Sequence, residues 1–282
     1  MPATRWQSGE MDASKAANDG VGARDGVALL AAGANVIMQL SILPVGRGVA
    51  ESRVETGRVD RHPFKRARTT LTYLAVATGG TEEDRQRLRR EINRVHAQVR
   101  SRPGDEVAYD AFDERLQLWV AACLYWGMED VTVRMHGPLG DRVEDFYCAG
   151  AVLGTTLQVP AEAWPEDREA FERYWQRGIA SIRMDEVTRA YLRGIADATF
   201  LPFPLDRMTG QLNRFLTLGF LPQEFRAELG LPWSERRQRR FERFIRMVAS
   251  VNRRLPRGLR EFPFNVLLRD ARRRWSRGIP VV

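Results

Sequence analysis

The sequence contains little of several features that would each point to a class of protein. Among its 282 residues are only two cysteines, Cys123 and Cys148, which is too few for a disulfide framework. Both lie in apolar helical patterns, where a reduced thiol behaves as a small hydrophobic group. No Cys-x-x-Cys-His motif and no His/Cys group with zinc-ligand spacing occurs. These absences exclude covalent c-type haem attachment and a zinc finger, and two reduced thiols predict a cytoplasmic location.

Long uncharged runs are also scarce. The segment 26–46 has no charged residue and is long enough to raise the question of a membrane span. It nevertheless contains Asn35, Gln39 and Pro44, and it follows the polar residues 1–25 rather than a short basic leader. We therefore predict a buried core helix here and expect neither a signal peptide nor a transmembrane helix. The preceding residues 1–25 lack periodicity and are predicted to form a disordered tail.

Alternating β-branched runs bounded by turns are missing, whereas apolar residues recur at helical spacing along most of the chain. An all-α protein is therefore expected, with residues 26–282 forming one domain because no rich linker divides them. Caps and Gly-Pro breaks delimit the predicted helices. These helices cover residues 63–79, 81–100, 110–136, 141–157, 165–182, 185–198, 211–218, 223–229 and 234–253.

Lysine is rare, so arginine supplies nearly all of the positive charge. Only Lys15 and Lys65 are lysines, and the net charge of the chain is +8. Residues 231–282 hold fifteen arginines and four acidic residues, so their net charge is +11 and that of residues 1–230 is −3. Only the last fifth of the chain therefore suggests an anionic partner. No nucleic-acid-binding motif accompanies this charge, and we expect no nucleic-acid partner.

The predicted helix 234–253 begins at Ser234 and combines an apolar stripe with a basic face. The stripe is formed by Phe241, Phe244, Ile245 and Val248. The favoured interpretation is a helix that packs on the core and exposes its arginines to water. The alternative is a peripheral element that binds an anionic membrane, helped by the run from Arg272 to Arg277.

Histidine is scarce as well, and one of the three histidines stands out. His96 falls on the apolar stripe of the predicted helix 81–100, which is formed by Leu88, Ile92, Val95 and Val99. A buried imidazole needs a partner, because an unpaired polar group costs about 1–3 kcal/mol. Either a backbone carbonyl, Tyr73 or Tyr109 satisfies it, or it serves as a ligand, for example to haem iron.

The other candidate side chains carry weaker signals. His62 precedes a proline at a helix start and is expected to be exposed, and His136 ends its helix, where an imidazolium complements the helix dipole. Arg66 and Thr70 are four residues apart on one helix face, and Tyr73 is the next residue on that same face. A guanidinium, a hydroxyl and a phenol in this arrangement suit a haem propionate or a polar wall above a haem.

Five sequence blocks resemble the MpaB-type oxygenase family, which includes the latex-clearing rubber oxygenases. They occur in the same order and span about residues 26–255. The blocks are His62–Leu74, Val95–Arg100, Tyr109–Asp113 with Leu118–Ala122, Trp164–Trp175 and Gly230–Ser234.

The resemblance implies a helical fold with a globin-like core that holds non-covalent haem b. It also implies an enzyme that uses dioxygen to oxidise or cleave carbon–carbon double bonds of apolar, isoprenoid-like substrates. The proximal iron ligand of the family corresponds to His96, and its Arg-x-x-x-Thr pair beside the haem corresponds to Arg66 and Thr70. Tyr73 lies on the same face. Glu51 is the candidate for the carboxylate that acts as catalytic base in rubber-cleaving members.

Two positions depart from the family pattern. Ala121 stands where many members have a second histidine, and Thr69 stands where rubber oxygenases have a lysine that ligates the iron. The second change predicts a five-coordinate or water-bound iron. An apolar wall is expected on the predicted helix 110–136, at Phe112, Leu116, Trp119 and Val120. The alternative is that this stripe is plain core. A second interpretation, suggested mainly by Ala121, is a non-catalytic helical binding protein that has lost haem or activity.

Overall fold

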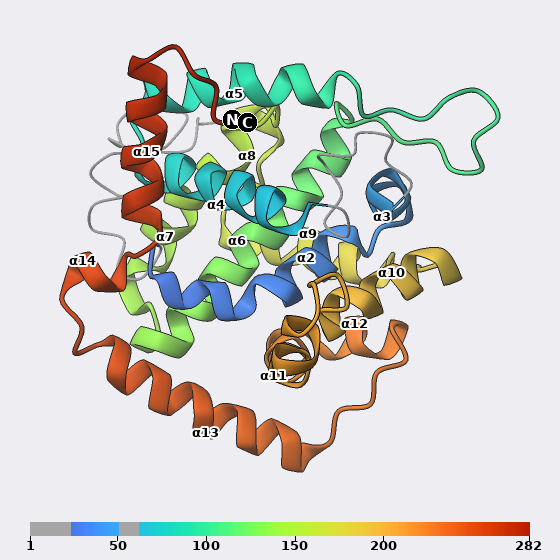
Figure 1. Cartoon of the computed structure of the whole chain (residues 1–282), viewed down its shortest axis with the longest axis vertical. Helices are drawn as coiled ribbons and strands as arrows, with labels where there is room; N and C mark the ends of the chain where they lie inside the picture. Colours follow the sequence, from blue (N-terminus) through green and yellow to red (C-terminus); the bar gives the residue numbers. More distant parts are fainter. Residues whose placement is uncertain (1–23, 51–61) are drawn as a thin grey trace.

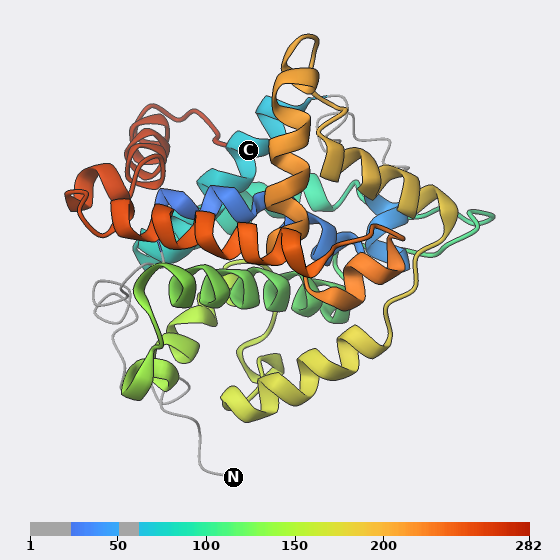
Figure 2. The same cartoon turned by 90° about the horizontal axis from the view of Figure 1, so that it is seen from below.

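The computed structural model describes residues 24–50 and 62–282, and helices joined by loops form these ranges (Figures 1 and 2). Extended pairing within them is limited to two isolated bridges, Ile42 with Arg183 and Arg100 with Asp110. The predicted all-α class is confirmed. No described helix is long and apolar enough to cross a membrane.

The helices follow one another with short connections. In chain order they are η1 (Gly26–Ala31), α2 (Ala32–Leu40), α3 (Leu43–Ala50), α4 (Pro63–Gly79), α5 (Glu82–His96), α6 (Glu114–His136), η3 (Gly140–Arg142), α7 (Val143–Gly150), α8 (Val152–Thr155), η4 (Ala161–Ala163), α9 (Arg168–Ala180), α10 (Glu186–Asp197), α11 (Leu205–Phe220), α12 (Gln223–Glu228), α13 (Glu235–Asn252), α14 (Arg257–Arg260) and α15 (Phe264–Ser276).

Two central helices organise the packing. The long α6 runs between α9 on one side and α2 and α13 on the other (Figure 2). The short α2 contacts α6, α10 and α11, and it is buried along most of its length. The helices α5, α8 and α15 all pack against α4. The candidate residues of α4 therefore lie on a helix that is packed by neighbours both near to it and far from it along the chain.

Local capping explains where several helices begin and end. Thr81 and Asp84 form a reciprocal capping box at the start of α5, as the sequence predicts. The Asp113 carboxylate accepts hydrogen bonds from the backbone N–H groups of Arg115 and Leu116 at the start of α6. Gly137 ends α6 with a φ of 88°, a conformation that favours glycine.

The helix predicted over residues 81–100 is shorter than expected, because α5 ends at His96. The chain then forms a projecting loop whose two arms pair with each other (Figure 1). The backbone N–H of Ser101 donates to the Tyr109 carbonyl at 2.8 Å, and that of Ala111 donates to the Val99 carbonyl at 3.0 Å. These cross-loop bonds replace the hydrogen bonds of a further helical turn, so His96 occupies a helix end rather than a helix interior.

Several other segments differ from the prediction. The predicted helix 211–218 is the longer α11, the predicted helix 141–157 divides into η3, α7 and α8, and α6 begins at Glu114 instead of residue 110.

Residues 26–46 contribute to the core as expected but form η1, α2 and the start of α3 instead of one helix. The arginine-rich end after residue 253, for which the sequence analysis predicts no helix, contains α15, which buries Phe264, Ala271 and Trp275 and packs on α4. Cys123 and Cys148 form no disulfide, and Cys123 is buried.

An aromatic cluster fixes the spacing between α6 and α9. The rings of Trp119 and Trp175 stack with centroids 5.3 Å apart, and Trp126 stacks on the other face of Trp175, also at 5.3 Å. Gly178 allows this close approach, since a Cβ atom there would lie 2.2 Å from Cζ3 of Trp119. An indole ring held between helices has no room to retreat.

Gly178→Ala is therefore expected to destabilise the protein by about 1–3 kcal/mol through overpacking. Gly258→Ala in α14 is the matched control, because a Cβ atom there meets nothing within 4 Å. The control is expected to leave stability unchanged within about 0.5 kcal/mol. Urea unfolding followed by circular dichroism measures both variants, and equal midpoints would contradict the packing argument.

Candidate functional site

His96 is the last residue of α5, and its side chain is half-buried. Its Nδ1 atom is buried and has no hydrogen-bond partner within the described ranges. The ring of Phe112 meets the imidazole edge-on, with centroids 6.4 Å apart. The structure thus leaves a buried nitrogen without a partner, as expected for a ligand and not for a satisfied core histidine.

The surroundings of His96 keep the imidazole neutral. The pKa of His96 is lowered from 6.5 to about 4, mainly by burial and in addition by the nearby charge of Arg66, while a hydrogen bond with Gln158 acts in the opposite direction. At neutral pH the imidazole is therefore uncharged, and one of its two ring nitrogens carries no proton. That lone pair is the one that a metal ion requires.

This shift predicts how the apoprotein responds to acid. The unfolded chain takes up a proton at the ordinary pKa of 6.5, whereas folded His96 does so only near pH 4. The contribution of neutral His96 to the free energy of unfolding is therefore complete above pH 6.5 and is lost as the pH falls toward 4. Between pH 7.5 and pH 5 the wild type is expected to lose about 2 kcal/mol more than His96→Gln. Parallel urea titrations test this, and identical losses would contradict it.

Arg66 brings a second helix to the site. It lies in the first turns of α4 and is close enough to His96 to influence its pKa. Burial lowers the pKa of Arg66 itself, and the interaction with Tyr191 of α10 opposes this effect. A guanidinium remains charged despite such a shift. The structure therefore places a half-buried cation beside a neutral imidazole, and a carboxylate ligand suits that cation.

An amide network supports the imidazole and was not found from the sequence. The Gln158 side chain donates to Asn93, one turn before His96, and accepts from Gln117 of α6. Its backbone N–H donates to the Gln117 side-chain oxygen at 2.9 Å. Gln117 also donates to the carbonyl of Ala111. Gln117, a buried polar residue on the largely apolar α6, was the one signal that the sequence offered for this network. Gln158 itself lies in a connection without periodicity.

Other expected site residues lie in different surroundings. Thr70 is half-buried one turn beyond Arg66. The Tyr73 hydroxyl donates to the Leu153 carbonyl and thus joins α4 to α8, and burial raises the pKa of this phenol. Ala121 is fully buried, and its Cβ atom would lie 3.4 Å from a Cβ atom added to Gly154. Glu51 lies outside the described residues.

The expected apolar wall divides into two parts. Phe112 precedes α6 and is 40% exposed, so its ring both covers His96 and meets solvent. Trp119 is fully buried in the aromatic cluster and donates its indole N–H to the Met38 carbonyl at 3.1 Å. Leu116 and Val120 are half-buried on α6. Trp119 therefore belongs to the core. Phe112 is the wall residue that contacts His96, the candidate iron ligand.

The remaining histidines lie elsewhere. His62 is exposed before α4, as predicted. His136 ends α6, but it is paired with buried Asp25 at 2.7 Å. Asn252 donates to the same carboxylate at 2.8 Å, and Nε of Arg260 lies 3.1 Å from it. Asp25, assigned to the tail from the sequence, is thus part of the folded core. Within the described ranges no three His, Cys, Asp or Glu side chains form a metal-binding group.

Comparison with known families decides what kind of protein contains this site. The family described as "ER-bound oxygenase mpaB/B'/Rubber oxygenase, catalytic domain" matches residues 20–250. The chain belongs to this family. The match includes α4 and α5, and therefore both Arg66 and His96. The resemblance predicted from the five sequence blocks is confirmed, and an oxygenase-type domain is the coarse functional assignment.

Two mycobacterial relatives of this MpaB/rubber oxygenase family member are similar along their whole length. They are the uncharacterized protein Mb2261 of Mycobacterium bovis and the uncharacterized protein Rv2237 of Mycobacterium tuberculosis. Each is 48% identical over 255 residues, which is 90% of this chain and 100% of the relative. No solved structure matches the chain.

Proposed function

We propose that the protein is an oxygenase that holds haem b non-covalently through His96. It would use dioxygen to oxidise or cleave carbon–carbon double bonds in an apolar, isoprenoid-like substrate. The observation that carries the proposal is the buried Nδ1 atom of His96, which has no partner within the described part of the chain. Membership of an oxygenase family supports the reaction class.

The donor set suits haem in two respects. A proton and an iron ion compete for the same imidazole lone pair, and His96, with a pKa of about 4, leaves that lone pair free at neutral pH. Arg66 is a half-buried cation beside His96, and a haem propionate is a carboxylate that would neutralise it. Thr70, one turn further along α4, is placed to donate a hydroxyl hydrogen bond to the same group.

The protein residues then have separate tasks. His96 would hold the haem, which would supply the capacity to activate dioxygen when bound. Gln158 hydrogen-bonds to the imidazole and orients it, and Asn93 and Gln117 hold Gln158 in place. Phe112 shields the imidazole from water. Glu51, outside the described residues, remains the proposed catalytic base.

A non-catalytic binding protein of the same family is the second candidate. Ala121 favours it, because the position is fully buried and closely packed against α8, so the second histidine of many members has no counterpart here. Thr69 also lacks the ligand chemistry of the lysine in rubber oxygenases. Neither change affects His96 or Arg66, and for that reason the oxygenase remains the first proposal.

Titration of the purified protein with haemin separates the two candidates. The oxygenase proposal expects a Soret band that saturates at one haem per chain. It further expects oxygen from labelled dioxygen to enter an unsaturated isoprenoid probe such as squalene. A protein that stays colourless with haemin contradicts the proposal. Saturable haem binding without oxygen incorporation into a series of such probes favours the binding protein.

A further inference from the structure

The face of α13 that points to solvent is distinct from its apolar stripe. Phe241, Ile245 and Ala249 are buried, and α13 packs on α6 and α11. The sequence-favoured interpretation of a core-packed helix is therefore correct for this stripe. The opposite side is formed by residues spaced four, three, four and four apart, which places them on one helical face. This basic–apolar face consists of Arg236, Arg240, Arg243, Met247 and Val251.

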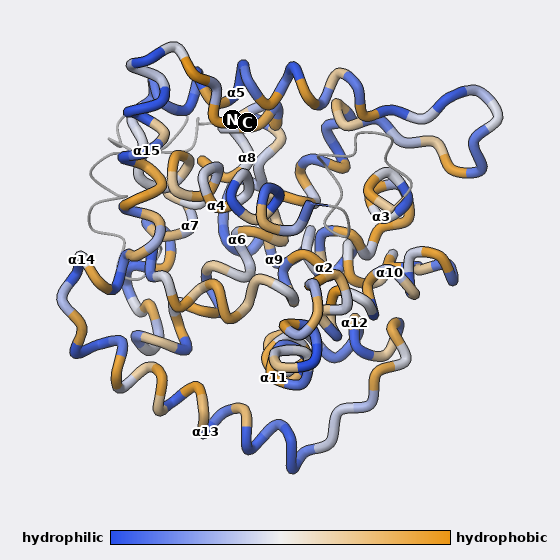
Figure 3. Tube along the Cα trace, viewed as in Figure 1, coloured by the Kyte–Doolittle hydropathy of each residue, from blue (hydrophilic) through white to orange (hydrophobic). Residues whose placement is uncertain are grey.

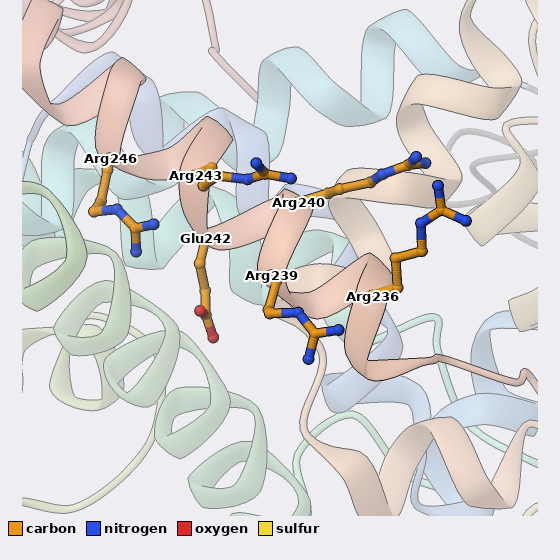
Figure 4. Close-up of a pocket in the computed structure, with 6 residues that line it drawn as sticks. All are labelled: Arg236, Arg239, Arg240, Glu242, Arg243 and Arg246. Carbon is orange, nitrogen blue, oxygen red and sulfur yellow. The ribbon is translucent and has the colours of Figure 1, made fainter.

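The first half of the basic–apolar face is strongly cationic. Five arginines and Glu242 of α13 line a surface depression of about 470 Å³, and Figure 4 shows Arg236, Arg240 and Arg243 extending to the same side of the helix. In the described part of the chain no ion pair forms with Arg236, Arg240, Arg243 or Arg246. The nearest acidic residue, Glu242, accepts a hydrogen bond from Gln238 at 3.0 Å. Positive charge thus accumulates here without internal compensation.

The second half of this face is apolar and exposed, and the segment after it exposes apolar side chains between its arginines. Met247 is 58% exposed and Val251 55%, and beyond α13 the exposure of Leu259 is 64% and that of Phe262 is 60%. Figure 3 shows hydrophilic residues concentrated at the start of α13 and more hydrophobic ones toward α14. α13 and α14 lie along one margin of the molecule (Figure 1), so a flat surface is able to contact both.

Exposed apolar side chains next to uncompensated arginines fit one kind of partner. An anionic bilayer offers phosphate groups to guanidinium groups and an apolar layer directly beneath them. A soluble polyanion satisfies the charges but leaves Met247, Val251 and Leu259 in water. We propose that the basic–apolar face and α14 form a docking surface for anionic phospholipid membranes.

Two arginines of the terminal run, Arg272 and Arg274, are held by contacts within the fold. Arg272 pairs with Asp84 at 2.7 Å, and Arg274 donates to the Pro280 carbonyl at 2.6 Å. The docking surface on α13 and α14 does not include these two side chains. An oxygenase docked in this way meets apolar substrates where they partition, although docking does not depend on haem.

Vesicle co-sedimentation tests the proposal with the full chain. The probes are vesicles of phosphatidylcholine alone and vesicles with equal parts of phosphatidylcholine and phosphatidylglycerol. The wild type is expected to bind only the anionic vesicles and to dissociate as salt increases. Binding to neither composition at low salt overturns the proposal. Because the readout is binding, the result is independent of whether the protein contains haem or oxidises a substrate.

The charge contribution is tested with paired variants. Arg240→Gln/Arg243→Gln is expected to weaken vesicle binding roughly 30-fold, at about fivefold per arginine near an anionic surface. Arg89→Gln/Arg90→Gln is the matched control, since both residues are exposed on α5, on the opposite side of the molecule (Figure 1). The control changes the net charge by the same amount and is expected to bind as the wild type does. If both variants lose the same vesicle affinity, binding depends only on the net charge of the protein, and the proposal is overturned.

The apolar contribution separates a membrane from other anionic partners. Met247→Ser/Val251→Ser keeps every charge and is expected to weaken vesicle binding about tenfold. Met208→Ser/Val187→Ser removes an exposed methionine and an exposed valine from α11 and α10, and it is expected to have no effect. Undiminished binding of the first variant, or duplex DNA binding in place of vesicle binding, overturns the proposal. So does conversion of a wild-type dimer to a monomer by that variant, because the face is then a subunit interface.

Discussion

His96→Ala is expected to abolish the Soret band that the wild type develops with haemin. The variant removes the one imidazole whose buried nitrogen is unpartnered in the described structure. Loss of an outer-shell partner typically costs 10–100-fold in metal affinity, so loss of the ligand itself is expected to weaken haem binding by at least about 100-fold. Absorbance titration with haemin measures the affinity of each variant.

Two controls keep this result interpretable. His62→Ala removes an exposed histidine outside the site and is expected to bind haemin as the wild type does. Imidazole added to His96→Ala is expected to restore part of the Soret band, because it replaces the missing ligand without a covalent link. An unchanged Soret band in a folded His96→Ala variant contradicts the assignment of His96 as the proximal ligand.

Asp25→Ala is expected to lower the free energy of unfolding by about 3–5 kcal/mol. The Asp25 side chain is 3% exposed. Its carboxylate pairs with His136 and Arg260 and accepts a hydrogen bond from Asn252, and these three residues come from different segments. Its removal leaves the Arg260 charge and two polar groups without their partner, and breaking a buried ion pair from one side has a cost of this size. Urea unfolding measured by tryptophan fluorescence gives the difference.

Asp270→Ala provides the matched comparison. Asp270 pairs with Arg68 at 2.8 Å, but about half of the Arg68 side chain and 42% of the Asp270 side chain are exposed. A surface pair of this kind contributes about 0–1 kcal/mol. Asp25→Asn, which keeps a hydrogen-bond acceptor, is expected to lose less than Asp25→Ala. Equal destabilisation by Asp25→Ala and Asp270→Ala would show that burial of the network is unimportant.

Local patterns in the sequence predicted most helix boundaries because capping acts within one turn. Thr81, Asp113 and Gly137 each lie within a few residues of the groups that they satisfy. The prediction was wrong after His96, where the loop bonds between Ser101 and Tyr109 and between Val99 and Ala111 compete with a further helical turn. It also missed α15, because arginine density hid the spacing of the apolar residues that pack on α4.

The candidate site was predictable in part. His96 and Arg66 were found because one is a rare residue on an apolar stripe and both fall in blocks shared with the family. Gln158 could not be found, since it comes from a connection sixty-two positions away along the chain. The role of His136 was misread for a similar reason: its partner Asp25 is 111 positions away, and periodicity contains no information about such pairs.

The sequence by itself determined the helical class, the family and the histidine that is proposed to bind haem, because periodicity, capping and residue identity are local properties. Only the tertiary structure decided which polar groups are left without a partner and which are satisfied. It left His96 Nδ1 alone beside Arg66, committed the Tyr73 hydroxyl to α8, and turned the arginines of α13 outward. These outcomes depend on which distant segments meet when the apolar surfaces of α2, α4 and α6 are buried, and that is settled by packing of the whole chain.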